Sequence, residues 1–581
     1  MQRKRIMAAV AVVAALATGL TACGGSGSSG SSGGGQFNAA VSTVFNPSDA
    51  KGGVIRMANS GDWDSLDPAD MYYSYEWDFA RLTGRSLLTF AAAPGGGGTK
   101  LVPDLATGMG TPSDGDKTWT YHIRTGVKFE DGTPVTSKDV KYAVERSLDK
   151  TVFPDGPTYF NDYLDLQGYT TPYSDPSPDK LGLKAVETPD DTTVVFHLNQ
   201  PFAAFDYFAM LPSTMPVEQS KDTGSDYKKH VMSTGPYMFG TNNLGKNFTL
   251  VRNPNWDPKT DPIRKALPNE FDVALNVNAD DIDQRLMAGD LDFDITGTGV
   301  QAAAQGKILG NPQLKANADN PASDRLWYTA INGDVAPLDN VHCREAVEFA
   351  ADRTGYLAAY GGATGGEIAT NLEPPVIPGA KAFNLYPSTG NTGDDAKAKE
   401  QLQQCNQPNG FSTNISYRAE RPKEKAAAEA LQQSLSKVGI KLTIKPFPQG
   451  DYGKLYAGKP DYAKNNQLGL MVYGWQADWP DGFGFFSQIT DSRVIRASGG
   501  NSNLGVKDPA VDALIDKAAV TEDITAREQV WDQVDQKVMQ DAYILPGVVA
   551  KSLLYRSSKV TNLFVSDGYG MYDYAAVGVK Q

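Results

Sequence analysis

The sequence predicts an α/β protein of two or three domains, because its length, composition and alternating patterns all fit that class. About 530 of the 581 residues lie beyond a Gly/Ser-rich segment near the N-terminus, which is more than one hydrophobic core holds. Hydrophobic residues make up 40% of the chain, with charges of both signs among them, as in ordinary globular proteins. Strand-like and helix-like segments follow each other: Phe271–Val277 alternates as a strand does, and Asp280–Ala288 has helical spacing. No internal repeat is visible.

The first residues predict an export signal that ends at a lipid-attachment site. Basic residues at positions 3–5 precede an apolar run, Ile6–Leu20, that is short for a membrane span. Leu20–Cys23 resembles the lipobox of bacterial lipoproteins, whose cysteine becomes the lipidated first residue of the mature chain. We therefore expect a signal peptide at residues 1–22, a lipid on Cys23 and a flexible tether at residues 23–50.

The charge of the chain excludes one large class of partner. Its net charge is −14, and it becomes −17 once the three basic residues of the signal are removed. An acidic protein of this kind is repelled by phosphates, so we expect no nucleic-acid partner. No second apolar run reaches the ~20 residues that a membrane helix needs. We expect an extracytoplasmic monomer that is held at the outer face of the membrane by its lipid alone.

The other two cysteines predict a disulfide. With Cys23 assigned to lipid, only Cys343 and Cys405 remain, and outside the cytoplasm an isolated pair is most simply bonded. A two-cysteine metal site is the alternative. Of the four histidines only His342 adjoins a cysteine, and neighbours in sequence rarely point at the same ion. We predict the Cys343–Cys405 disulfide, no metal site and no cofactor.

Taken in order, the elements of the body begin with a strand at Gly52–Ala58, and Met71–Ser86 then has helical spacing. In the next recognisable stretch, Trp119, Tyr121 and Ile123 alternate as a strand does. Thr136 or Ser137 then caps a helix that carries apolar residues on one face. Further along, Lys423–Val438 is amphipathic and follows a proline, and the alternating strand Gly439–Lys445 comes after it.

The stretch Gly469–Phe486 predicts a ligand site. An apolar run up to Tyr473 is typical of a buried strand, and four glycine or proline residues between Gly474 and Gly484 then predict a loop. The loop carries Asp478 and Asp481 among tryptophan and phenylalanine rings. A carboxylate among rings can receive a ligand ammonium, because the rings exclude water and can add cation–π attraction. The alternative is a packed turn with two solvated acids.

Several motifs in order resemble one family. Thr118–Arg146 is similar to the signature of the family 5 extracytoplasmic solute-binding proteins, the peptide-, dipeptide- and nickel-binding subunits of ABC importers. The resemblance runs from about residue 51 to the end of the chain. Its other motifs are Leu66–Pro68, Ser233–Tyr237, Leu250–Trp256, Asp339–Val347 with Ala351–Arg353, and Gly474–Asp481.

The resemblance implies a fold of two α/β lobes, of the periplasmic-binding-protein type, that are joined by two chain crossings. On that template the first lobe comprises residues 51–88, 216–323 and 545–581, and an extra subdomain is inserted at residues 89–215. The second lobe comprises residues 324–544.

The resemblance also implies a function and a site. In peptide-binding members the acid of the Trp-x-x-Asp segment holds the ligand's α-ammonium, and here that residue is Asp478. Trp475, Trp479 and Tyr473 are expected as further contacts, and Asn371 as a weaker one. Gly482 stands where the family often has proline, which affects the shape of the loop. The expected function is capture of short peptides by lobe closure and delivery to the membrane subunits of an ABC permease.

The sequence offers little support for catalysis. A Gly-x-Ser-x-Gly motif lies in the tether at Gly30–Gly34, where no strand or helix frames it, and zinc-protease and phosphate-loop motifs are absent. Three alternatives stay open. A peptide-sensing or adhesion protein could bind its ligand and never pass it on. The same receptor could take oligosaccharide, nickel-chelate or another amine-bearing solute, or a secreted glycosidase-like hydrolase could use Asp478 with Asp481.

Overall fold

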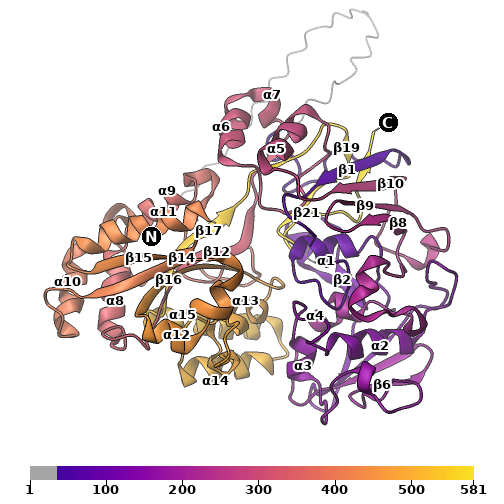
Figure 1. The fold of residues 1–581 in the computed structure, drawn as a ribbon, viewed down its shortest axis with the longest axis horizontal. Helices are drawn as coiled ribbons and strands as arrows, with labels where there is room; N and C mark the ends of the chain where they lie inside the picture. Colours follow the sequence, from indigo (N-terminus) through magenta and orange to yellow (C-terminus); the bar gives the residue numbers. More distant parts are fainter. Residues whose placement is uncertain (1–35, 64, 420, 581) are drawn as a thin grey trace, which may run out of the picture. The chain divides into compact units, whose positions relative to one another are not determined.

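The computed structural model describes residues 36–63, 65–419 and 421–580. The signal peptide predicted at residues 1–22 and the lipid site predicted at Cys23 lie outside the described residues. Gln36–Gln581 form one compact unit, in which helices and strands alternate along the chain (Figure 1). That alternation is what an α/β chain predicts.

Two four-stranded sheets form what we call the first lobe. The first has the order β1 (Val54–Ala58), β10 (Glu270–Ala274), β9 (Asn247–Arg252) and β8 (Tyr237–Asn243). The second has the order β4 (Thr111–Ser113), β5 (Thr118–His122), β7 (Thr193–His197) and β6 (Val186–Asp190). β1 pairs with β10 in parallel, and the other pairs are antiparallel.

The described part of the first lobe also contains seven α-helices: α1 (Ser74–Ala80), α2 (Ser137–Ser147), α3 (Tyr159–Tyr163), α4 (Asp206–Ala209), α5 (Ala279–Ala288), α6 (Ala302–Gly310) and α7 (Pro312–Lys315). Of the two residues expected to cap α2, Thr136 is the one that does so, and its backbone N donates to Asp139 Oδ2 at 2.7 Å. α1 is shorter than expected because Tyr73 is extended and the helix begins only at Ser74. The segment Leu291–Ile295 makes one isolated bridge, from Phe293 to Arg556.

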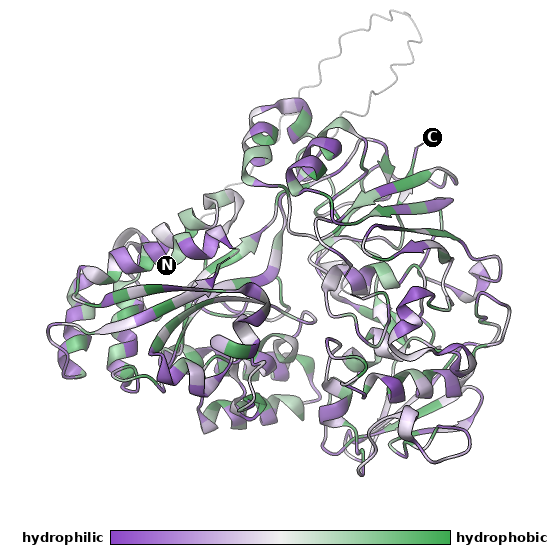
Figure 2. Ribbon diagram, in the orientation of Figure 1, coloured by the Kyte–Doolittle hydropathy of each residue, from purple (hydrophilic) through white to green (hydrophobic). Residues whose placement is uncertain are grey.

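A six-stranded sheet forms what we call the second lobe. Its order is β13 (Gly366–Ile368), β17 (Ile544–Lys551), β12 (Ala322–Ile331), β16 (Leu468–Gln476), β14 (Ser412–Arg418) and β15 (Lys441–Phe447). Its helices are α8 (Val341–Ala350), α9 (Arg353–Ala359), α10 (Asp395–Gln404), α11 (Pro422–Ser436), α12 (Pro460–Asn465), α13 (Gly482–Thr490), α14 (Pro509–Ala519) and α15 (Ile524–Gln540). Figure 2 shows hydrophobic residues along the strands of this sheet, whereas its helices alternate hydrophobic and hydrophilic residues.

The chain crosses between the lobes twice, at a small two-stranded ladder. β11 (Ala318–Asp319) leads into β12, and β17 leads out to β18 (Leu554–Tyr555), which pairs with β11. The expected return to the first lobe at residue 545 therefore comes too early. β17 stays in the second lobe's sheet through Lys551, because it pairs with both β12 and β13.

Three more short ladders are found in the described part of the first lobe. Their strands are β2 (Leu88–Phe90) with β3 (Leu101–Pro103), β19 (Val560–Thr561) with β22 (Gly578–Val579), and β20 (Val565–Ser566) with β21 (Met571–Tyr572). The last two pairs bring the C-terminal segment of the chain into the first lobe, where its valines and tyrosines are buried.

The tether expected at residues 23–50 ends earlier than predicted. Ala40 and Phe45 are buried, and the Ala40 backbone N donates to Asp319 Oδ1 at 2.9 Å. Phe45 N donates to Leu563 O at 2.8 Å, and its ring lies over the Arg556 guanidinium. From residue 36 onward the segment is therefore part of the packed structure, because its backbone and the Phe45 ring contact residues beside the crossing.

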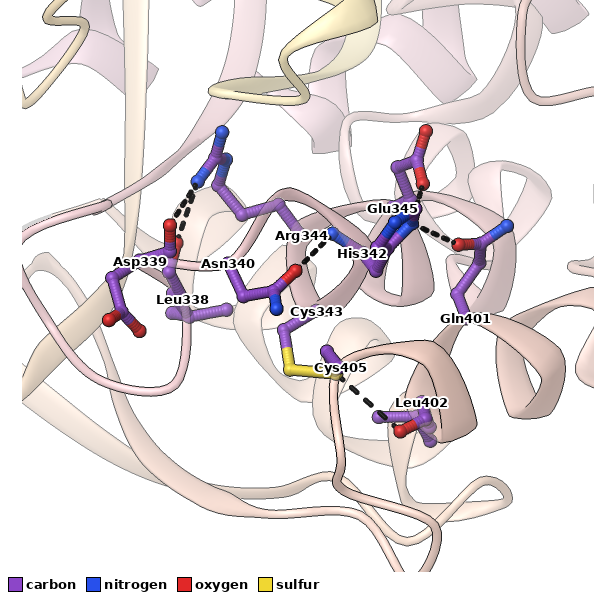
Figure 3. The surroundings of a disulfide bond; sticks show 10 residues. All are labelled: Leu338, Asp339, Asn340, His342, Cys343, Arg344, Glu345, Gln401, Leu402 and Cys405. Atoms are coloured by element: carbon purple, nitrogen blue, oxygen red, sulfur yellow. Dashed lines mark hydrogen bonds and ion pairs between the residues drawn. A yellow bond between two sulfur atoms is a disulfide. The ribbon is translucent and has the colours of Figure 1, made fainter.

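The structure joins Cys343 and Cys405, the two cysteines expected to pair, with Cα atoms 5.5 Å apart (Figure 3). Cys343 is on α8, and Cys405 follows α10, so the bond ties these two packed helices together. His342 points away from the sulfurs and contacts Glu345 and Gln401 instead. Among the described residues, no group of His, Cys, Asp and Glu side chains is arranged to hold a metal ion.

Candidate ligand-binding site

The glycines of Gly469–Phe486 allow close packing rather than a long loop. β16 runs through Gly474 to Gln476. Glycine fits at position 474 because a Cβ there would stand only 2.2 Å from the Trp327 ring on the neighbouring strand. α13 begins at Gly482, where a Cβ would stand 2.1 Å from the Trp531 ring. The loop predicted for this stretch is therefore wrong in extent, and only residues 477–481 connect strand to helix.

Asp478 lies in that connection, half-buried, and faces two tyrosines of the first lobe. The Tyr72 hydroxyl donates to Asp478 Oδ2 at 3.0 Å, and the Tyr159 hydroxyl donates to the same oxygen. The Asp478 backbone N donates to Gly484 O at 3.1 Å, which holds the residue against the first turn of α13. Neither tyrosine was predicted, because they lie 406 and 319 residues away and only folding brings them here.

The surroundings of Asp478 favour its neutral form in the absence of a ligand. Burial raises the pKa of Asp478 to about 7, although the hydrogen bonds from Tyr159 and Tyr72 pull it down. Burial and the neighbouring carboxylate raise the pKa of both phenols well above 10. Both tyrosines therefore keep their protons at neutral pH and act as donors to Asp478.

Trp479, predicted as a ligand contact, is a packing residue. Its side chain is fully buried, and its ring centroid lies 4.8 Å from Tyr159, 5.5 Å from Tyr207 and 5.8 Å from Phe208. Phe483 on α13 continues this contact to Phe202, at 4.7 Å between ring centroids. We call the rings of residues 159, 163, 202, 207, 208, 479 and 483 the aromatic interface, since it joins α3 and α4 of the first lobe to α13 of the second.

Tyr473 and Trp475 are half-buried on β16, close to Asp478, and stay predicted contacts. The Tyr473 ring lies 6.0 Å from Tyr328 and 6.1 Å from Tyr452, and the Arg418 guanidinium lies 4.8 Å above it. The Trp475 indole N–H has no hydrogen-bond partner within the described residues. Both side chains therefore remain able to contact a bound molecule.

Asn371, the weaker predicted contact, does not join this group. It is buried, and its Nδ2 donates to Asp535 Oδ2 on α15 at 2.9 Å. The backbone N atoms of Leu372 and Glu373 donate to the same carboxylate. The amide thus fixes the segment after β13 onto α15. Its N–H groups already donate hydrogen bonds within the protein.

Three arginines near the site were missed by the sequence analysis. Arg325 on β12 and Arg421 lie over the Trp327 ring, and Arg418 at the end of β14 lies over Tyr473. Burial and mutual repulsion lower the pKa of Arg325 and of Arg421. Within the described residues Glu424 is the only carboxylate in an ion pair with this group, so the three cations carry an excess of positive charge.

Asp481 is not available as a partner of Asp478. Its Oδ1 caps α13 by accepting from Phe483 N at 2.8 Å, and its Oδ2 lies 3.6 Å from Arg527 Nε. A helix cap in an ion pair is a structural carboxylate. This geometry disfavours the hydrolase alternative, which needs both acids on one substrate bond.

Comparison with known proteins places the chain in a family. Residues 100–495 match the bacterial extracellular solute-binding proteins, family 5 middle. The solved structure of clavulanic acid biosynthesis oligopeptide binding protein 2 is 40% identical, with a TM-score of 0.91 over 94% of this chain and 99% of that one. Among the described residues, none of the helices has both the length and the apolar character for crossing a bilayer.

Two related proteins show how widely ligands vary among similar chains. Di/tripeptide-binding protein 1 of Pseudomonas aeruginosa is 27% identical over 88% of this chain and 92% of its own. Heme-binding protein A of Haemophilus influenzae is also 27% identical, over 83% of this chain and 85% of its own. The family match and the structural likeness confirm the two-lobed α/β fold, and this chain belongs to the family 5 bacterial extracellular solute-binding proteins.

Proposed function

We propose that this protein is the lipid-anchored substrate-binding subunit of an ABC importer and that it captures short peptides. The single observation that carries the proposal is Asp478, a carboxylate with one oxygen held by two phenols and the other left for a ligand. The oligopeptide-binding and di/tripeptide-binding names of two similar proteins support the same ligand class.

The ammonium of a peptide fits the unused side of Asp478. No hydrogen bond from the described residues reaches Oδ1, whereas Oδ2 accepts from Tyr72 and Tyr159. A primary ammonium at Oδ1 would form a charge-assisted hydrogen bond in a site with little water, where such bonds are strongest. A neutral sugar would leave the carboxylate unpaired, which disfavours the oligosaccharide alternative.

The arginines supply charge of the opposite sign near the two acids Asp324 and Asp478. Arg325, Arg418 and Arg421 have one ion-paired carboxylate among them, so a ligand carboxylate or another anionic group would relieve their repulsion. A ligand that carries both an ammonium and an anion therefore fits the charge pattern better than either charge alone. Free peptides have both groups.

Groups from both lobes meet at this site. Asp478 and the arginines belong to the second lobe, and Tyr72 and Tyr159 belong to the first, so a bound ligand is contacted from both sides. A ligand that contacts both lobes stabilises the closed state by its differential affinity for that state. The closed protein would then deliver its cargo to permease subunits, with the lipid on Cys23 keeping it near them.

The test is native mass spectrometry of the protein with a pool of di- to hexapeptides, beside the same pool with acetylated amino termini. We expect retention of free-amine peptides only, and a loss of about 100-fold in affinity for Asp478→Asn, since hydrogen bonds to charged groups contribute ~1.5–3 kcal/mol. Asp294→Asn, which changes a carboxyl of raised pKa elsewhere in the first lobe, serves as the matched control.

Equal binding of the acetylated pool would remove the ammonium anchor but keep the receptor. Absence of any peptide binding, with heme or a metal chelate retained instead, would overturn the peptide assignment. An Asp294→Asn variant as weak as Asp478→Asn would show that the loss reflects general damage to the fold.

A further inference from the structure

A second carboxylate, Asp324, lies beside Asp478 at the end of the two central strands. Asp324 is on β12, whose neighbour β16 ends at Gln476. The Ala477 backbone N faces Asp324 O at 3.4 Å, and Asp478 follows directly. Burial raises the pKa of Asp324 to about 7, the charge of Arg325 lowers it, and the charge of Asp478 raises it by a smaller amount. The two acids therefore share one corner of the second lobe.

Asp324 is a buried acid with an oxygen that nothing satisfies. Its residue is 1% exposed, and Oδ1 has no hydrogen-bond partner within the described residues. The Arg325 guanidinium does not pair with it but donates to the Gln476 amide oxygen. That bond turns the Gln476 amide nitrogen toward Asp324, where it helps to hold the carboxylate in place. Buried polar atoms are nearly always paired, so an unpaired carboxylate oxygen indicates a missing partner.

A glycine of the first lobe lies next to this oxygen. A Cβ at Gly570 would stand 3.5 Å from Asp324 Oδ1 and 3.3 Å from Gln476 Nε2. The Gly570 φ of +68° also favours glycine. The preceding residue, Tyr569, accepts a hydrogen bond from Ser74 Oγ at 2.7 Å, two positions beyond Tyr72. Asp324 Oδ1 thus faces the same part of the first lobe that carries one of the Asp478 phenols.

Neither acid is in an ion pair with a lysine or arginine of the described residues. Arg325 lowers the pKa of Asp324 through its charge, but its hydrogen bond goes to Gln476, so the Asp324 oxygen itself stays without a donor. Two neighbouring buried carboxylates repel each other and are stabilised by cations placed between or beside them.

Resting on the proposed peptide-binding function, we propose that Asp324 forms a second anionic subsite, for a cationic side chain on the ligand's first residue. The α-ammonium would occupy Asp478 Oδ1, and the side-chain cation would reach Asp324 Oδ1. Peptides that begin with a basic residue are then preferred over peptides that begin with an apolar residue of the same length.

The test uses two synthetic tripeptides, Lys-Ala-Ala and norleucine-Ala-Ala, which differ only in the terminal charge of the first side chain. Isothermal titration of the intact protein should show a preference for the lysine peptide of about tenfold, the contribution expected of one hydrogen-bonded charge. Asp324→Asn should abolish that preference and leave the norleucine peptide bound within about threefold of its original affinity.

The variants separate this inference from the proposed function. Asp478→Asn should weaken both peptides, because both place their α-ammonium there, and Asp294→Asn should weaken neither. A wild-type protein without preference, or an Asp324→Asn variant that keeps it, would overturn the second subsite while the receptor stands. Failure of both peptides to bind the wild-type protein would overturn the proposed function itself.

Discussion

Asp478 and Trp479 are neighbours in the chain, yet they belong to regions with opposite properties. Asp478 lies in a polar site whose charges are incomplete: an acid without a cation on one side, arginines in excess on the other. Trp479 lies in the aromatic interface, where rings from both lobes already cover each other. The polar site needs a ligand to be satisfied, and the aromatic interface does not.

The difference teaches how closure and recognition can be divided between adjacent residues. Burial of large rings stabilises contact between the lobes without regard to what is bound, because the hydrophobic effect is not directional. Charge pairing in the neighbouring site is directional and depends on the ligand's groups. The aromatic interface should therefore set how readily the lobes meet, and the polar site should set which ligand they enclose.

The largest expected effect tests that division with two tryptophans. Trp479→Ala should lower the free energy of unfolding by about 3–5 kcal/mol, as for other fully buried tryptophans, because it leaves a cavity in the aromatic interface. Trp475→Ala, at a half-buried position, should lower it less and should change peptide affinity instead. Guanidinium unfolding followed by titration with a free-amine peptide measures both quantities. Equal losses of stability for the two variants would contradict the division.

The sequence predicted the local parts of this structure well. The strand and the capped helix of Thr118–Arg146 form where expected, as β5 and α2, because alternation and capping are properties of neighbouring residues. These signals are short in range, and so a single sequence carries them.

Contacts between distant segments could not be predicted in the same way. Nothing near Tyr72 or Tyr159 indicates that they meet Asp478, because the contact depends on how two lobes fold and close. The glycines misled for a related reason. Gly474 and Gly482 were interpreted as breaks in regular structure, but they make room for Trp327 and Trp531, whose positions are set by tertiary packing.

A loss of stability of intermediate size should show that the Asn371 amide has a structural role and does not bind the ligand. Asn371→Leu should lower the free energy of unfolding by about 1–3 kcal/mol, because it removes the donor at 2.9 Å from the buried Asp535 carboxylate. Peptide affinity should stay within about twofold, since the amide lies outside the polar site. Thermal unfolding and titration calorimetry measure the two. Lost affinity at unchanged stability would return Asn371 to the ligand site.

The smallest effect, and the most specific to the polar site, is its response to pH. The pKa of Asp478 is about 7 without a ligand, raised mainly by burial, and the same holds for Asp324. An ammonium binds the ionised carboxylate, so peptide affinity should fall below pH 7, by up to about tenfold per pH unit, and level off above it.

The stability of the ligand-free protein should change in the opposite direction. A carboxyl whose folded pKa is raised binds its proton more tightly than the unfolded chain does. Its contribution to stability is therefore present at low pH and is lost as pH rises from its ordinary value near 3.8 through about 7. Tyr72 and Tyr159 do not titrate in this range, because their pKa values lie well above 10. Titrations between pH 5.5 and 8.5 should show affinity rising while ligand-free stability falls, and Asp478→Asn should flatten the rise in affinity. If affinity were independent of pH in the unaltered protein, the ammonium would have to be bound by a group other than Asp478. The polar site at Asp478 would then not determine which ligand is bound.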